Sequence, residues 1–289
     1  MSVRLLVLGG QGMLGHKLWE VANAQGVEAW ATVRRSSGVV MAPERAIELA
    51  DVANFDALLP IVARVRPDVI VNCVGVVKQL PGAKDAIPSL TLNALLPHRL
   101  AALSRAAGAR FVHISTDCVF SGRAGNYRED AMPDAEDLYG RSKLLGEVGA
   151  PALTLRTSII GRELYGAHGL VEWFLAQTGR VQGYRRAIFS GLTTLELSRT
   201  ILDVLTRHQE LEGLYHVAAA PIDKHTLLTL IATAYGRQNP IAPVDAPAID
   251  RSLDGARFVA ETGRRAPAWE RMIGEMAAEN ARYAEWRKS

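Results

Sequence analysis

The chain has 289 residues, of which 48% are apolar and 22% are charged, and its formal net charge is +3. This composition supports a large core, so we expect one large domain, or a domain with an appended lobe, and no extensive disorder. The basic residues form no Lys/Arg-rich run that could follow a nucleic-acid backbone, so nucleic acid is not an expected partner. The two cysteines, Cys73 and Cys118, lie in apolar contexts, which favours a reducing compartment over a disulfide framework.

Membrane insertion and secretion are not expected. No apolar run approaches the roughly 20 residues that a membrane-spanning helix needs. The apolar residues at the N-terminus continue directly into a glycine turn, so no separate signal peptide is predicted. The sequence therefore predicts a cytoplasmic protein with no membrane partner.

Short apolar runs alternate with helical patterns up to about residue 160. Strands buried on both faces are predicted at 3–8, 27–33, 69–74, 110–115 and 153–157. Helices are predicted at 13–25, where Gly26 is the stop, at 92–107 and around Tyr139. Strands and helices that alternate in this way predict an α/β fold, with a doubly wound parallel sheet and helices on both of its faces.

The second half of the chain has a less regular pattern. Residues 161–191 are rich in Gly, Arg and aromatic side chains. After them, helices are predicted at 195–207, 226–234 and 269–287, with a strand at 214–217. We therefore expect a sheet domain over 1–160 and a smaller C-terminal lobe over 161–289. Segments 153–160 and 192–220 are expected to pack back on the sheet.

A glycine-rich turn joins the first predicted strand to the first predicted helix. It reads Gly9-Gly10-Gln11-Gly12-Met13-Leu14-Gly15. Glycines let the backbone turn tightly and approach a pyrophosphate, whose charge is stabilised at the positive N-terminus of the helix. This placement predicts a dinucleotide cofactor, and a tight turn without a ligand is the alternative. The candidate cofactor residues of the turn are Gly9, Gln11, Gly12, Met13 and Leu14.

The ends of the next strands bear on which cofactor is bound. Arg34 and Arg35 follow the second strand, where an acidic residue would hold the ribose 2′-OH of NAD. Arginines can neutralise a 2′-phosphate instead, so NADPH is favoured and NADH stays open, while a solvated loop pair is the alternative. Position alone predicts further cofactor contacts at Asp51, Val52, Cys73, Val74 and Gly75.

Tyr139 and Lys143 are the only Tyr and Lys of the chain that lie four residues apart. On a helix this spacing puts both side chains on one face, where an ammonium can lower the pKa of a phenol. A phenol tuned in this way can pass a proton near neutral pH. Ser115, Thr116 and Asp117 end the fifth strand, so they are expected at the ligand-binding edge of the sheet. Their alternative role is that of ordinary turn residues.

Together these segments resemble the extended short-chain dehydrogenases/reductases, and most closely their dTDP-4-dehydrorhamnose reductase branch. The resemblance is carried by residues 9–15, 114–122, 139–144 and 155–157, and it is looser beyond residue 160. It implies a Rossmann fold that binds NAD(P) in the sheet domain and substrate in the C-terminal lobe.

The resemblance also implies residue roles. Thr116 would hydrogen-bond a keto oxygen and Tyr139 would donate the proton. Lys143 would hold the nicotinamide ribose and lower the pKa of Tyr139. Asn93 matches a family position at the helix beside the cofactor, and Ser115 is also expected to contact the cofactor.

Two departures from the family pattern bear on the reaction. Relatives that dehydrate sugar nucleotides carry an acidic pair after the Thr, whereas here Asp117 is followed by Cys118. A thiol beside Phe120 is a poor general base, so dehydration is disfavoured. Reductases of the branch usually have an aromatic residue where Cys118 stands, which leaves the particular sugar undetermined.

Candidate substrate residues are Asp117, Arg185, Arg186 and Arg251. The two adjacent arginines lie in the irregular segment, where an arginine can clamp a diphosphate, and a solvated basic turn is equally expected. The seven histidines show no spacing that assembles a metal site.

The sequence therefore predicts an NAD(P)H-dependent reductase of a nucleotide-linked 4-keto-6-deoxy sugar, in deoxysugar or polysaccharide biosynthesis. Hydride transfer from NADPH to the ring ketone would be completed by a proton from Tyr139. Two alternatives stay open: a sugar-nucleotide epimerase with tightly bound NAD, and a non-catalytic NADP-binding regulatory subunit. The oligomeric state stays open, and a homodimer is one candidate because many relatives dimerise through the helices that carry Asn93 and Tyr139.

Overall fold

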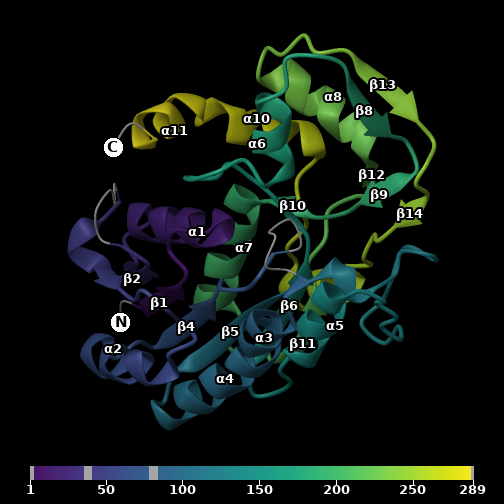
Figure 1. The fold of residues 1–289 in the computed structure, drawn as a ribbon. Coiled ribbons are helices and arrows are strands. Elements are labelled where there is room, and N and C mark those ends of the chain that lie inside the picture. Colours follow the sequence, from purple (N-terminus) through teal and green to yellow (C-terminus); the bar gives the residue numbers. More distant parts are fainter. Residues whose placement is uncertain (1–2, 36–40, 78–83, 288–289) are drawn as a thin grey trace.

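A seven-stranded parallel sheet forms the centre of the molecule. The computed structural model describes residues 3–35, 41–77 and 84–287. The strands are β1 (Arg4–Leu8), β2 (Glu28–Val33), β3 (Ala46–Glu48), β4 (Val69–Asn72), β5 (Arg110–Thr116), β6 (Leu153–Thr157) and β11 (Gly213–His216). Their spatial order is β11-β6-β5-β4-β1-β2-β3 (Figure 1), and every neighbouring pair is parallel. This topology confirms the predicted doubly wound sheet, whose order reverses between β1 and β4, the place where such sheets bind ligands.

Helices cover both faces of the sheet (Figure 1). The longer ones of this part are α1 (Met13–Ala24), α2 (Leu58–Val65), α4 (Leu96–Ala106) and α7 (Thr194–Arg207). The alternation of side chains along β1 explains the two cores. Leu5 and Val7 belong to the core under α1 and α7, whereas Leu6 and Leu8 belong to the core against α2 and α4. Both faces are therefore apolar, as expected for a buried parallel strand.

Several short helices position residues at the carboxyl edge of the sheet. They are α3 (Ala86–Ser89), a π-helix (Leu90–Leu95), α5 (Leu138–Leu145) and 3₁₀ turns at Phe55–Ala57 and Asp117–Val119, while a further 3₁₀ turn, Pro43–Arg45, directly precedes β3. The π-helix runs directly into α4, and π-type turns inside helices occur frequently at functional sites.

The C-terminal half contributes the remaining elements. Its helices are α6 (Leu170–Leu175), α8 (Lys224–Ala234), α9 (Ala256–Thr262), α10 (Trp269–Ala278) and α11 (Asn280–Trp286). Its short strands pair as β7 (Ile159–Ile160) with β10 (Leu192–Thr193), β8 (Val181–Tyr184) with β13 (Ile241–Val244), and β9 (Ala187–Phe189) between β12 (Ile222–Asp223) and β14 (Ile249–Asp250). Within the described ranges, no helix has the length and apolar character needed to cross a bilayer.

Two expectations for this half need correction. The helix predicted at 269–287 is wrong, because the structure has two helices that meet at Glu279. The second helix lies over α1, where the Tyr283 hydroxyl is 2.6 Å from His16 Nε2. The irregular segment 161–191 contains α6 and β8, so it is more structured than its composition indicates.

The loop after β5 fastens the lobe to the sheet. Asp250 donates its backbone N–H to the Gly122 carbonyl at 2.7 Å, and Arg251 Nε donates to the Phe120 carbonyl at 2.8 Å. Tyr127 forms an isolated β-bridge with Leu253. These contacts place residues 249–253 of the lobe against the segment that directly follows Thr116.

Candidate active site

The glycine turn has the geometry of an anion-binding helix N-terminus. A Cβ on Gly15 would lie 2.1 Å from the Gly9 carbonyl oxygen, so only glycine allows α1 to approach β1 this closely. Gly12 is the exposed N-cap of α1, it offers no side chain to cap the helix, and the first turn carries no acidic residue. The first N–H groups of α1 can therefore bind an anion, which fits the pyrophosphate of a dinucleotide.

The residues after β2 lie beside this turn. The Arg34 N–H donates to Gln11 Oε1 at 2.8 Å, and Gln11 Nε2 donates to the Arg35 carbonyl at 3.1 Å. Gln11 thus joins the glycine turn to the end of β2. Both arginine side chains are exposed at this junction, where a 2′-phosphate would lie.

The other predicted cofactor positions have mixed surroundings. Asp51 is exposed and accepts the Ala53 N–H at 2.9 Å, whereas Val52 packs against the core under α2 and α4. Met13 is half-buried and lies near Gly169, whose Cβ would be 2.4 Å from the Met13 methyl carbon, and Leu14 is buried.

The end of β4 lies between the glycine turn and the helices beyond it. A Cβ on Gly9 would be 3.0 Å from the Val74 side chain, and one on Gly75 would be 3.0 Å from Asn93 Oδ1. Cys73 lies near Lys143, and burial raises the pKa of its thiol to about 12. The thiol therefore stays protonated and acts as a small apolar side chain at the cofactor edge.

Thr116, Asp117 and Tyr139 meet at the end of β5. The Thr116 hydroxyl lies beside the Tyr139 phenol, is 3.2 Å from Asp117 Oδ1 and accepts the Cys118 N–H at 3.1 Å. Burial raises the pKa of Tyr139, and the Cys118 and Asp117 charges act in the same direction. The phenol is thus held in its protonated form, ready to donate.

Helix α5 is placed by its N-cap and by Gly140. Asp137 caps the helix by accepting the Gly140 N–H at 2.7 Å. A Cβ on Gly140 would be 2.3 Å from the Cys118 carbonyl oxygen, so the helix backbone touches the segment after Thr116. This contact brings the adjacent Tyr139 to Thr116.

The Lys143 ammonium is directed into the protein. It is buried, donates to the Ile114 carbonyl at 2.7 Å and lies 3.4 Å from His113 Nε2. Burial lowers the pKa of Lys143 to about 8. Burial dominates the pKa of Tyr139 and raises it, so the expectation that Lys143 lowers this pKa stays a prediction.

Two predicted cofactor side chains are occupied elsewhere. The Ser115 hydroxyl donates to Glu147 Oε1 at 2.6 Å, because alternation along β5 points Ser115 and Thr116 to opposite faces. Asn93 is fully buried, accepts the Val76 N–H at 2.9 Å and donates to the Ser142 hydroxyl at 3.2 Å. Asn93 therefore links the end of β4 to α5, and the cofactor contacts expected for Ser115 and Asn93 stay predictions.

The family model for the RmlD substrate binding domain matches residues 3–281 of this chain. The chain belongs to this family. This result confirms the resemblance found in the sequence motifs, and it extends over the irregular C-terminal half.

Relatives and solved structures agree with this assignment. Over 293 residues the chain is 26% identical to the spore coat polysaccharide biosynthesis protein SpsK of Bacillus subtilis, covering 96% of this chain and 98% of SpsK. It is 30% identical over 230 residues to a dTDP-4-keto-6-deoxy-D-glucose reductase of Streptomyces niveus, covering 76% and 74%. The dTDP-4-dehydrorhamnose reductase of Bacillus anthracis, solved in complex with NADP, shares the fold, with a TM-score of 0.81 at 22% identity over 96% of this chain and 100% of that one.

In this RmlD-type chain the lobe brings Arg251 to the catalytic edge, whereas Arg185 lies at the surface. Burial raises the pKa of Asp117, and the nearby Arg251 charge opposes that shift. Arg185 is exposed and binds Asp245 with two hydrogen bonds of 2.9 and 2.8 Å. Arg186 is exposed beside it. Arg185 thus forms an ion pair at the surface, and the substrate contacts predicted for Arg185 and Arg186 stay predictions.

Sequence reasoning missed two residues of the site. Lys224, the first residue of α8, faces Asp117 and Cys118, and burial lowers its pKa while the Asp117 charge raises it. His113 lies beneath Lys143. A signal for Lys224 existed, because the chain has only six lysines and this one directly follows a short strand and an Asp cap. A histidine inside an apolar strand gives no such signal.

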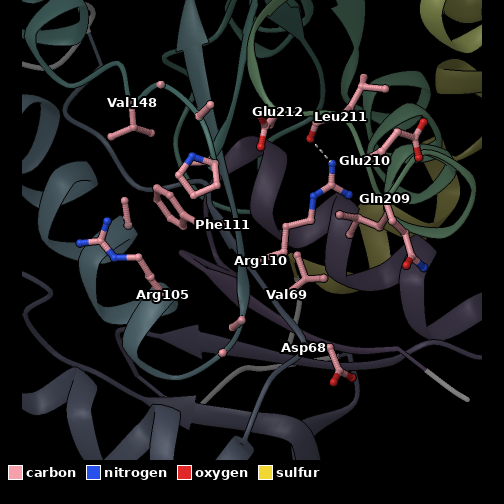
Figure 2. A pocket seen from close by; sticks show the side chains of 18 of the residues that line it. Asp68, Val69, Arg105, Arg110, Phe111, Val148, Gln209, Glu210, Leu211 and Glu212 are labelled. Carbon is pink, nitrogen blue, oxygen red and sulfur yellow. Dashed lines mark hydrogen bonds between the residues drawn. The ribbon is translucent and has the colours of Figure 1, made fainter.

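A cavity of about 810 Å³ lies at the opposite edge of the sheet (Figure 2). Its lining includes Val69 and Arg110, the first residues of β4 and β5. The Arg110 guanidinium donates to the Leu211 carbonyl at 2.7 Å, the bond drawn in Figure 2, and to two further carbonyls. The length of β5, about 20 Å at 3.3 Å per residue, separates this cavity from Thr116, so it is not the candidate active site.

Proposed function

We propose that this protein is a cytoplasmic NADPH-dependent reductase of a nucleotide-linked 4-keto-6-deoxy sugar, acting in polysaccharide biosynthesis. The observation that carries the proposal is the placement of the Thr116 hydroxyl beside the Tyr139 phenol at the carboxyl end of β5, with Lys143 one helical turn further along. Membership of the RmlD family supports the substrate class, as do the names of the relatives, which include reductases of dTDP-linked keto sugars.

Each residue of this set has a distinct task. When bound, NADPH supplies the hydride that converts the ring ketone to an alkoxide. Thr116 hydrogen-bonds the oxygen that gains charge, and Tyr139 donates its phenolic proton to that oxygen. Lys143 in its charged form stabilises the phenolate that remains on Tyr139.

NADPH is proposed over NADH because of the residues after β2. Arg34 and Arg35 are exposed beside the glycine turn, and Gln11 fastens their backbone to that turn. A guanidinium at this position attracts a 2′-phosphate. Replacement of both arginines by Ser should raise the KM for NADPH roughly tenfold or more, and that for NADH by less than about twofold.

Lys224 and Arg251 are proposed to bind an anionic oxygen of the nucleotide diphosphate. Both act electrostatically on Asp117, which lies next to Thr116. Arg251 is fixed by its bond to the Phe120 carbonyl, and the Lys224 ammonium lies 5.2 Å from the centre of the Phe189 ring. Two cations beside one buried carboxyl leave an excess positive charge that a phosphate can neutralise.

An NADPH oxidation screen over 4-keto dTDP-, UDP-, GDP- and CDP-sugars tests the proposal. We expect cofactor-free protein to oxidise NADPH with one of these substrates and to lose that activity in Tyr139→Phe. Protein that purifies with bound NAD and needs no added reductant would instead indicate an epimerase. Binding of NADPH without turnover of any sugar would indicate a regulatory subunit.

We further propose that the protein is a homodimer through α3, the π-helix and α5. Ile87 and Leu145 expose 78% and 61% of their surface, and Leu90 and Leu95 are exposed on the same group of helices. Contiguous exposed apolar side chains of this kind usually pack against a partner. Light scattering should give twice the mass of 31.3 kDa, and Ile87→Lys combined with Leu145→Lys should give the monomer.

A further inference from the structure

A chain of polar contacts connects the end of β4 to the Lys143 amine. The Val74 N–H is 3.1 Å from Asn72 Oδ1, and Asn72 Nδ2 is 3.2 Å from His113 Nδ1. His113 Nε2 is 3.4 Å from Lys143 Nζ, which is 2.7 Å from the Ile114 carbonyl oxygen. Asn72 and His113 are fully buried neighbours in the sheet, because they are register partners on β4 and β5.

The direction of these hydrogen bonds follows from the backbone. The amide of Val74 can only donate, so the side-chain oxygen of Asn72 must face it and the NH₂ group must face His113. His113 Nδ1 is therefore an acceptor. The buried imidazole is neutral, since burial holds its pKa well below 6.5. A neutral imidazole carries one hydrogen on its two ring nitrogens, and since Nδ1 accepts, this hydrogen must lie on Nε2.

This tautomer directs a hydrogen at the Lys143 nitrogen. An ammonium has three hydrogens and no lone pair, so it cannot accept from Nε2–H, whereas a neutral amine can. The neutral amine still donates to the Ile114 carbonyl. Every hydrogen bond of the network is satisfied only when Lys143 is uncharged, and an unsatisfied buried donor is costly.

The other charges around Lys143 work against this preference. Glu147, which follows α5, favours the charged amine, whereas the Cys73 thiol after β4 is protonated and carries no charge. Tyr139 lies one turn earlier on the same helix, and His98 of α4 acts on His113. The hydrogen on His113 Nε2 is therefore the contact that favours the neutral form together with burial.

We propose that His113, fixed by Asn72 in the tautomer with hydrogen on Nε2, is a positioning residue that sets the protonation of Lys143. Its effect on turnover rests on the proposed function, because only the charged Lys143 stabilises the Tyr139 phenolate. Raising the pH then removes the charge from Lys143 within the range where the enzyme works.

The tautomer can be measured directly. Long-range ¹H–¹⁵N correlation spectra of histidine-labelled protein distinguish protonated from bare ring nitrogens, and His113→Gln or Asn72→Asp assigns the His113 signals among seven histidines. Between pH 6 and 9 we expect a neutral ring with hydrogen on Nε2. A ring with hydrogen on Nδ1, or an imidazolium, would overturn the proposal.

A second experiment reverses the tautomer of His113 while leaving both His113 and Lys143 in place. In Asn72→Asp the carboxylate still accepts from Val74 but also accepts from His113, which moves the hydrogen to Nδ1 and turns Nε2 into an acceptor for the ammonium. The titration of Lys143, followed by lysine ¹³Cε signals and assigned with Lys143→Arg, should move up by roughly one pH unit or more. Asn239→Asp, whose amide bonds Gln177 and Gly179 in the lobe, is the matched control and should leave the titration unchanged.

The added carboxylate also acts through space, so a double-mutant cycle isolates the tautomer. In a His113→Phe background, or His113→Leu if that variant does not fold, Asn72→Asp should move the Lys143 titration by less than half as much. Equal shifts of the Lys143 titration in both backgrounds would show that the added carboxylate charge alone is responsible, and would contradict the proposal. The alkaline limb of kcat/KM should follow the NMR titration. If no keto sugar is reduced, the proposed function fails, while the two NMR experiments still decide the role of His113.

Discussion

The carboxyl edge of the sheet and the face of the lobe above it contribute to the same site in different ways. Thr116, Tyr139 and Lys143 lie on a regular strand and a regular helix, and their spacing along the chain already places them together. Lys224 and Arg251 follow the two-residue strands β12 and β14, which both pair with β9. Regular elements thus hold the groups proposed to carry out the chemistry, and short irregular ones hold the groups proposed to bind the substrate, where variation costs the fold little.

The largest expected effect is on the sheet side. Tyr139→Phe removes the proton donor and should lower kcat by roughly 10²- to 10⁴-fold, with little change in the KM for NADPH. Steady-state rates and cofactor titration measure this difference. Tyr184→Phe in the lobe, whose hydroxyl bonds Gln182, is the control with an unchanged rate. A Tyr139→Phe enzyme with normal folding and normal turnover would remove the assigned role.

Substitutions in the lobe should change the KM for the sugar nucleotide and leave kcat nearly unchanged. Lys224→Met or Arg251→Met should raise the KM for the sugar nucleotide by roughly 10- to 100-fold, because each removes a charge-assisted hydrogen bond. Arg185→Met should change it less than about twofold, since Arg185 is held by Asp245 at the surface. Equal losses in all three variants would show that the lobe acts only through its overall charge.

Two glycines with opposite surroundings test the placement of α5. Gly140→Ala puts a methyl 2.3 Å from the Cys118 carbonyl oxygen, so we expect a loss of roughly 1–3 kcal/mol of stability together with lower kcat. Gly274→Ala in α10 meets no atom within 4 Å and should stabilise the protein by roughly 0.4–1 kcal/mol. Chemical denaturation and rate measurements on both variants separate the two effects.

A further expected effect is a pH dependence of stability at the contact between α1 and α11. His16 is buried between the Gly12 carbonyl and the Tyr283 hydroxyl, and burial lowers its pKa to about 3. The unfolded chain binds the proton of this histidine more tightly than the folded protein does. The stability that comes from burying neutral His16 is therefore complete above about pH 6.5 and is lost as the pH falls toward 3. In that pH range, His16→Gln should reduce the fall in the free energy of unfolding by up to about 1.4 kcal/mol per pH unit.

Thermal unfolding at pH 7.5 and pH 5.0 measures this difference. The exposed His168→Gln variant should follow the wild-type protein. A His16→Gln protein with the same pH dependence as the wild type would contradict the prediction.

Much of the catalytic set follows from local pattern. The apolar runs before Gly9 and up to Ser115 predict parallel strands, and strand ends at one edge bring Thr116 to the glycine turn. The helical spacing from Tyr139 to Lys143 then puts phenol and amine on one face. Local pattern did not predict the hydrogen bond of the Ser115 hydroxyl to Glu147, since one step along a strand reverses the side chain. It also did not predict that burial dominates the pKa of Tyr139 or that Lys143 donates to the Ile114 carbonyl.

The sequence by itself determined the parallel sheet, the cofactor turn and the order of Thr116, Tyr139 and Lys143. Each of these depends on residues close together in the chain, where hydrophobic periodicity and helix or strand spacing fix the geometry. Only the tertiary structure decided that Lys224 and Arg251 face Asp117 and that His113 lies under Lys143. Those contacts join segments far apart in sequence, and local periodicity shows which face a segment buries but not which distant segment packs against it.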